Sequence, residues 1–423
     1  MSNDWLNYAP RPAALGSDER WHVFLSYRSV TRAWVLQLYD LLRQLEYSVF
    51  LDQYVLSAAA PLGLSIQEAL GTSRSAVMVW SAAFEDSKWC MTELNTLITM
   101  EQNRPGFSYI IAKVDAAPLP VIAAGKLYVD FSDQPDGAAG VGMLRLLYGL
   151  SGQPLSPEAV QAAAVYDDRL KAGRAAIAAA RAMGDAPRLM QLAAGDALEW
   201  KTTPALGCEA AEALIALKEY NAALDIVVPL IERFSRSVRP KQLQALAKAR
   251  SGDWQGAQLG LGELYAAGEI DPETLGLYAR TWMDRYNATG NRLFLLKSRD
   301  LYRQAFEAAP KDYYTGINAA SKSLLLGERE TAAQIAKRVE ALVGTIAKTN
   351  DYWQTATAAE IQLLQGKYRE AGQLYAHAVG IAPLDVGSHE TTWKQAQLLC
   401  DALGATADER GLIAVVFSHL AGV

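Results

Sequence analysis

The sequence predicts an α/β domain, built on a doubly wound sheet of five parallel strands, followed by an all-α array of helical pairs. Three observations carry this prediction. As far as about residue 150, short apolar runs alternate with helical patterns, as expected of parallel strands that are buried on both faces. Beyond that point strand-like runs disappear and alanine becomes abundant. At 423 residues the chain is also too long for one ordinary core.

Five apolar runs are predicted as strands. They are VFLSY (23–27), SVFLD (48–52), SAVMVWS (75–81), SYIIAKV (108–114) and KLYVDFS (126–132). Helical patterns such as 31–45 and 90–102 lie between them and end at polar residues or at Pro and Gly. Strands that alternate with helices in this way form a doubly wound sheet. We expect the flavodoxin-like order, in which ligands bind between the first and third strands.

The chain divides into four parts by the same criteria. We expect a disordered arm over residues 1–20, the sheet domain over 21–150, a linker over 151–157 and the helical array over 158–423. The linker is rich in Gly, Pro and Ser, and the composition changes on its far side.

Four segments of the helical part share one pattern, in which an aromatic or basic residue is followed three positions later by alanine. The alanines are Ala223, Ala257, Ala332 and Ala371. The first two segments, around Tyr220 and Trp254, are 34 residues apart, which is the tetratricopeptide period. A small residue at this position lets the two helices of a pair approach closely. The later steps are less regular, so we predict a degenerate tetratricopeptide-like solenoid.

Composition excludes several classes of function. The formal net charge is −6 and there is no block of Lys and Arg, which argues against nucleic acid as the main ligand. Three cysteines and four histidines are scattered, so no metal site is expected. No apolar run has membrane-spanning length and no signal peptide is recognised, so we expect a cytoplasmic protein that does not bind membranes.

Three segments of the first part follow one another in a characteristic order. They are VFLSYRS (23–29), SVFLD (48–52) and SRSAVMVWSAAFEDSKWCMTEL (73–94). With them, residues 21–150 resemble a Toll/interleukin receptor (TIR) domain. The third segment is the most specific, because strand, serine-ended turn, Trp-Cys and Glu-Leu occur in the family's order. In the helical part, 271–286 and 305–328 are similar to the tetratricopeptide-like TRAF-binding region of apoptosis signal-regulating kinases.

The predicted crevice of the sheet lies beside one candidate carboxylate. Ser26, Tyr27 and Arg28 close the first strand, the third strand ends at Ser81, and its connection leads to Trp89 and Glu93. Residues four apart on a helix are neighbours, so Trp89 and Glu93 can face one ligand together. From the residues alone, an exposed helix carboxylate is the preferred interpretation of Glu93, and Trp89 is equally a packing residue. Cys90 is expected in the core.

Many TIR domains cleave NAD, and their catalytic glutamate lies four residues after this tryptophan. The resemblance therefore implies that Glu93 is catalytic, that NAD is the substrate, and that no cofactor or metal is needed. Ser26, Tyr27, Ser81 and Trp89 are then expected around the nucleotide. Arg28 and Arg32 are expected to hold the diphosphate, since guanidinium groups offer forked donors to phosphate. The plain alternative for each arginine is a solvated surface residue.

The resemblance also implies a setting and an assembly. We expect an NAD glycohydrolase or cyclase, controlled by a helical-repeat sensor whose trigger is unknown, in immune or antiviral defence or in cell-death signalling. Self-association through the TIR domain is expected to complete the site. The loop over 53–65 is apolar and lacks the family's charged Asp-Leu-x-Pro-Gly pattern; it either forms that interface or folds back on its own domain. The alternatives are a non-enzymatic TIR adaptor and a sensor that binds a nucleotide without cleaving it.

Overall fold

The computed structural model describes residues 5–51, 62–82, 88–123, 125–126, 128–135, 137–343 and 351–420. The chain forms two compact units, Met1–Asp271 and Pro272–Val423. The first unit contains the sheet together with the first helices of the array, and the second unit is helical.

The sheet has five parallel strands in the order β2-β1-β3-β4-β5. They are β1 (Trp21–Ser26), β2 (Val49–Phe50), β3 (Ser73–Trp80), β4 (Ser108–Lys113) and β5 (Tyr128–Asp130). Ser26 at the end of β1 pairs in register with Met78 of β3. The predicted doubly wound sheet and its strand order are therefore confirmed. In the described residues the two edge strands, β2 and β5, span only part of the runs predicted for them.

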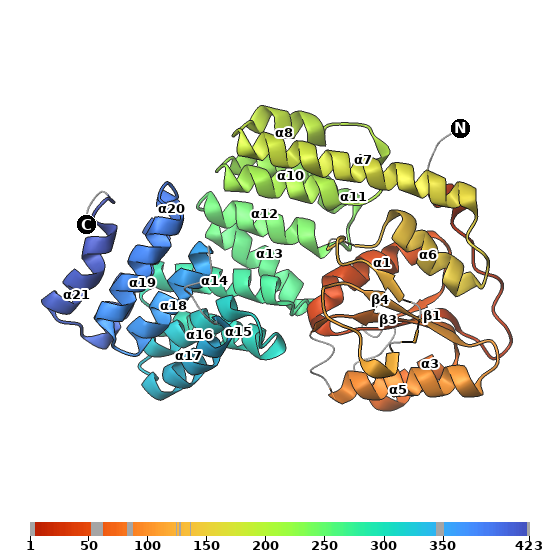
Figure 1. The fold of residues 1–423 in the computed structure, drawn as a ribbon, viewed down its shortest axis with the longest axis horizontal. Helices are drawn as coiled ribbons and strands as arrows, with labels where there is room; N and C mark the ends of the chain where they lie inside the picture. Colours follow the sequence, from red (N-terminus) through yellow and green to blue (C-terminus); the bar gives the residue numbers. More distant parts are fainter. Residues whose placement is uncertain are drawn as a thin grey trace. The chain divides into compact units, whose positions relative to one another are not determined.

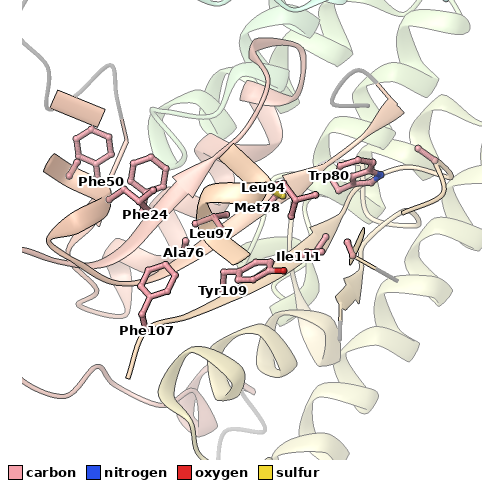
Figure 2. Packing of buried hydrophobic residues seen from close by; sticks show 14 residues of the cluster. Phe24, Phe50, Ala76, Met78, Trp80, Leu94, Leu97, Phe107, Tyr109 and Ile111 are labelled. Carbon is pink, nitrogen blue, oxygen red and sulfur yellow. The ribbon is translucent and has the colours of Figure 1, made fainter. Parts of the chain in front are cut away.

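Helices cover both faces of this sheet (Figure 1). α1 (Arg32–Gln44) and α6 (Gly140–Ser151) lie on one face, and α3 (Leu62–Gly71) and α5 (Lys88–Asn103) on the other. Figure 2 shows the core under α5, where Leu94 and Leu97 pack among Ala76, Met78 and Tyr109 of the two central strands. This packing fixes the rotation of α5 about its axis, and so decides where Glu93 lies.

Residues 5–20, predicted as part of a disordered arm, are instead packed against the first unit. Trp5 begins the 3-10 helix η1 (Trp5–Tyr8), is fully buried, and lies 5.9 Å from the Tyr166 ring, measured between centroids. The Tyr47 hydroxyl donates to the Pro10 carbonyl at 3.0 Å. Sequence periodicity does not reveal such a segment, because its contacts are made by single side chains of distant helices.

Helices α7 to α13 complete the first unit, and α14 to α21 with η5 form the second. In the first unit they are α7 (Pro157–Ala182), α8 (Ala186–Ala193), α9 (Leu198–Lys201), α10 (Ala205–Ala216), α11 (Tyr220–Arg233), α12 (Val238–Arg250) and α13 (Trp254–Ala266). In the second they are α14 (Pro272–Thr289), α15 (Arg292–Ala308), α16 (Tyr313–Leu325), α17 (Arg329–Val343), α18 (Tyr352–Leu364), α19 (Tyr368–Ile381), α20 (Val386–Leu403), α21 (Ala407–Ala414) and η5 (Val415–Phe417).

The four predicted alanines are all buried, each one turn into the second helix of a pair. The prediction missed a further pair, α14 and α15. There α15 begins at Arg292, and the residue three positions later is Leu295, which is fully buried in the place of an alanine. With Arg292 included, a second helix starts every 34 to 39 residues, so the array is more regular than the sequence pattern indicated.

The helices within these described ranges include none with the combined length and apolar character that crossing a bilayer requires.

Candidate functional site

The candidate site centres on a hydrogen bond between two residues that are 67 positions apart in the sequence. The Ser26 hydroxyl, at the carboxyl end of β1, donates to Glu93 Oε2 on α5 at 2.5 Å. Ser26 is buried and Glu93 is half-buried. The structure therefore brings together two of the predicted site residues, at the edge of the sheet where ligands bind in doubly wound folds.

The sequence around Glu93 explains this placement. Leu94 is fully buried and Leu97 is 1% exposed, so the face of α5 that carries them is fixed against β3 and β4. Glu93 flanks that face, and its half-buried side chain reaches over to the end of β1. The bond from Ser26 restricts the orientation of this carboxylate at the end of β1.

Ser81 follows β3 directly and is 4% exposed. Within the part of the chain that the structure describes, its hydroxyl has no hydrogen-bond partner. A buried hydroxyl without a partner costs free energy, so such groups commonly await a ligand or an ordered water. Ser81 thus lies at the strand ends as predicted from the sequence, and its contact with a nucleotide stays a prediction.

Asp115 is a residue at this edge that the sequence analysis missed. Its Oδ2 accepts from the Ala82 N–H at 2.7 Å, and its Oδ1 accepts from the Ala117 N–H at 2.9 Å. The carboxylate thus ties the connection after β3 to the connection after β4 and fixes the backbone next to Ser81. The signal was an acid just past a buried strand and followed by small residues, a pattern typical of an Asx turn.

Tyr27 and Arg28 follow β1 and are both half-buried. Thr31 donates its N–H and its hydroxyl to the Arg28 carbonyl, each at 2.9 Å, which closes the tight turn before α1. Arg28 is thereby held between the end of β1 and the beginning of α1. The side chain of Trp89 and residues 53–61 of the apolar loop lie outside the described residues, so the predictions made for them stay predictions.

Arg32 is placed differently from what the sequence analysis expected. It is 5% exposed, and its guanidinium donates to the carbonyls of Gly268 at 2.7 Å and Ala267 at 3.2 Å. It also forms an ion pair with Glu269, with 3.1 Å between Nη2 and Oε1. The donors that were assigned to a diphosphate are therefore occupied by the protein. Nothing in the sequence pattern pointed to Glu269, which is more than 230 residues away.

A second polar cluster lies in the other unit but is satisfied internally. Lys322 is buried and donates to Asn318 Oδ1 at 2.8 Å. Burial lowers the pKa of Lys322 to about 8. Glu360 accepts from Gln395 at 2.9 Å, and burial raises its pKa. Groups that satisfy one another in this way are explained by packing of the helices and need no ligand. No cluster of three or more metal-ligating side chains occurs among the described residues.

Two family models match the chain. The model of the TIR domain matches residues 23–145, and the model named Tetratricopeptide Repeats-Sensor matches residues 209–326. The resemblance of the first part to a TIR domain and the tetratricopeptide-like character of the second part are thereby confirmed, while the similarity to the TRAF-binding region stays a prediction. A search of the curated proteins finds no match.

Similar solved structures are tetratricopeptide proteins. A thermophilic TPR protein of Thermus thermophilus is 20% identical, with 47% of this chain and 97% of that chain covered and a TM-score of 0.37. A tetratricopeptide repeat protein of Parabacteroides merdae is 12% identical, with 50% of this chain and 78% of that chain covered and a TM-score of 0.34.

Proposed function

We propose that this protein, in which a TIR domain over residues 23–145 precedes a tetratricopeptide repeats-sensor domain over 209–326, cleaves NAD at the site around Glu93. One observation carries the proposal, the hydrogen bond of 2.5 Å from Ser26 to Glu93. With this bond a carboxylate lies at the carboxyl ends of the strands, the edge at which nucleotides bind in sheets of this order.

A single carboxylate is sufficient for this reaction. Ordinary glycosidases need a second carboxyl group as an acid, because their leaving alkoxide must be protonated. Nicotinamide leaves a pyridinium cation as a neutral molecule when the bond from its nitrogen to ribose C1′ breaks. Glu93 then stabilises the positive charge that develops on the ribose. Water attacks C1′ and releases one proton to give ADP-ribose, or an internal nucleophile of the nucleotide gives a cyclic product.

The other groups at this edge suit the rest of the nucleotide. The Ser81 hydroxyl, buried without a partner among the described residues, is available to a ribose or amide oxygen. Arg28 stands next to the beginning of α1, where the positive end of the helix favours a diphosphate. We assign the diphosphate to Arg28 because of its position between the end of β1 and the beginning of α1.

The two domain types suggest how such an activity is controlled. We propose that the repeats sense a partner or ligand and that self-association of the TIR domain raises the activity. We further propose a role in immune defence or cell-death signalling through loss of NAD. The corresponding test is expression in cells, where wild type is expected to lower NAD and arrest growth, and Glu93→Gln is expected to do neither.

The direct experiment measures nicotinamide release from NAD by the purified full chain at low and high protein concentration. Glu93→Gln is expected to lower turnover by about 100-fold or more, the usual effect of losing one preorganised electrostatic group. The control is Glu101→Gln on the same helix, where the carboxylate is paired with Lys126. It is expected to keep full turnover.

A rise of specific activity with concentration would support self-association. Equal turnover in Glu93→Gln and wild type would refute the assignment of Glu93. Absence of turnover at every concentration, together with binding of NAD, would favour a nucleotide-binding sensor. Absence of both would favour a non-enzymatic adaptor.

A further inference from the structure

Residues 267–269, in the segment that joins α13 to the second unit, contact the side chain of Arg32, the first residue of α1. Ala267 and Gly268 present their carbonyls to the Arg32 guanidinium, and Glu269 presents its carboxylate. Arg32 and Glu269 are 5% and 4% exposed, so this ion pair is buried. Three acceptors from three successive residues thus enclose one cation.

Gly268 is required for this arrangement. Its φ is +88°, a conformation that glycine adopts easily and other residues rarely. A Cβ atom at this position would also lie 3.0 Å from Arg32 Nη1. Any side chain here would both strain the backbone and press on the guanidinium.

The hydrogen bonding between Arg32 and this segment is nevertheless incomplete. Within the described part of the chain, Arg32 Nε and Glu269 Oε2 are buried without a hydrogen-bond partner. Burial raises the pKa of Glu269 to about 7, against the attraction of Arg32, and Asp271 acts in the same direction as burial. Burial therefore works against the charged form of Glu269 and weakens its hold on Arg32. A buried ion pair of this kind stabilises weakly, because desolvation of both groups offsets their attraction.

The ion pair of Arg32 and Glu269 lies close to the candidate site along the chain. Arg32 follows Ser26 by six residues, and only the turn that contains Arg28 lies between them. Glu269 precedes by two residues the end of the first unit at Asp271. Farther along α1, Gln37 contacts Ser237 and Asp40 pairs with Arg236 at 3.0 Å, so an earlier loop between helices holds the same helix.

We propose that residues 267–269 form an internal anion that occupies Arg32 in the resting protein, and that withdrawal of this segment frees Arg32 to bind the diphosphate of the substrate. The inference rests on the proposed function and names its regulation. A guanidinium left buried without its carboxylate is strongly unfavourable, so an incoming diphosphate is a natural replacement. The sequence prediction for Arg32 then describes the active state.

Two variants release the segment in different ways. Glu269→Gln removes the charge and keeps the shape, and Gly268→Ala introduces strain and a contact with Arg32. Their matched controls are Arg236→Gln, which breaks the more exposed pair with Asp40, and Gly252→Ala. Gly252 has a φ of +97° in the preceding turn and no neighbouring atoms within 4 Å of a Cβ. The control therefore reproduces the backbone strain without touching Arg32.

Each protein is tested as the full chain by two readouts. Hydrogen exchange over residues 26–36 and 262–271 reports release of the segment, and steady-state kinetics give kcat and KM for NAD. Both releasing variants are expected to speed exchange and to lower KM by about 5-fold or more, within the usual range of coupling between sites. Adding Arg32→Met to Glu269→Gln should abolish the decrease in KM. Both control variants should behave as wild type.

The two readouts separate the possible failures. Faster exchange in the releasing variants with no NAD turnover in any protein would refute the proposed function and keep the internal anion. Unchanged exchange in both releasing variants would overturn the inference, whether or not NAD is cleaved. Faster exchange with an unchanged or higher KM would also overturn it, since Arg32 would then be structural only.

Discussion

Buried polar groups at the two ends of the sheet differ in whether their hydrogen bonds are satisfied. At the amino ends of the strands, the Ser73 hydroxyl donates to the Ala69 carbonyl at 2.7 Å, and both ring nitrogens of His22 have partners. At the carboxyl ends, Ser81 is buried without a partner among the described residues, and Ser26 is bonded to a half-buried carboxylate. Both ends are polar, so polarity alone does not identify a site. The difference in satisfaction of hydrogen bonds supports the proposed site at the carboxyl ends, because unpaired groups are costly unless a ligand or water completes them.

The largest effect on this comparison is expected from Arg74, at the amino end of β3. Its guanidinium donates to the carbonyls of Ala13 at 2.9 Å and Ala14 at 2.6 Å, and it is ion-paired with Glu19. Arg74→Met is expected to lower the free energy of unfolding by about 1–3 kcal/mol, since several acceptors lose their donor. NAD turnover per folded molecule should not change. Chemical denaturation and nicotinamide release are the two measurements.

The control for Arg74 is Arg20→Met, which breaks an exposed ion pair with Glu68. Exposed pairs contribute little to stability, so no clear change is expected. A loss of turnover in Arg74→Met that exceeds the loss of folded protein would contradict the view that this end of the sheet is purely structural.

A smaller effect separates two serines, one at each end of β3. Ser73→Ala leaves the Ala69 carbonyl without its hydroxyl donor and is expected to cost about 1 kcal/mol of stability, with unchanged affinity for NAD. Ser81→Ala removes an unpartnered hydroxyl, so it should leave stability unchanged or slightly raised, and it should weaken NAD binding several-fold. Thermal unfolding with and without NAD measures both. The reverse pattern would show that the carboxyl end is satisfied in solution and the amino end is open.

The smallest effect is a pH dependence from His22. Its Nδ1 accepts from the Ser48 N–H at 2.8 Å and its Nε2 donates to the Ala13 carbonyl at 3.0 Å, so the bonded ring is neutral. Burial, with a smaller contribution from Arg74, lowers the pKa of His22, while the bond to Ala13 and the charge of Glu19 act against this.

Because the folded pKa is the lower one, the unfolded chain binds the proton first. The contribution of His22 is therefore complete above its ordinary value of about 6.5 and is lost as the pH falls below it. His22→Gln should reduce the fall in unfolding temperature between neutral and mildly acidic pH, and the exposed His377→Gln should leave it as in wild type. An identical fall in all three proteins would mean that His22 does not titrate as inferred.

Local patterns are sufficient to predict the fold and part of the site. Continuous apolar runs identify the strands. The flavodoxin-like order, expected among the doubly wound orders, places Glu93 near the end of β1 without any knowledge of contacts. Leu94 and Leu97 form the buried face of the helix that carries it, as the helical spacing predicts.

What the sequence does not reveal depends on distant partners. Arg32 reads as an exposed residue near a nucleotide, and only the packing of α1 on the array brings Glu269 to it. The repeat formed by α14 and α15 was missed because Leu295 stands where the pattern requires a small residue, and the structure accommodates this larger side chain. Asp115 is visible only as a turn residue until both connections that it joins are seen together.

The packed arm of residues 5–20 affects how the TIR domain can be transferred to another protein. Trp5 is buried against Tyr166 of α7, and the Tyr148 hydroxyl of α6 donates to the Tyr8 carbonyl at 3.0 Å. The arm therefore fastens the helix after the sheet domain to the segment before it. A fragment cut at the limits of the family match, residues 23–145, would lack both sides of this contact. Exchange of effector domains between proteins of this architecture should accordingly transfer residues 5 to 271 as one piece.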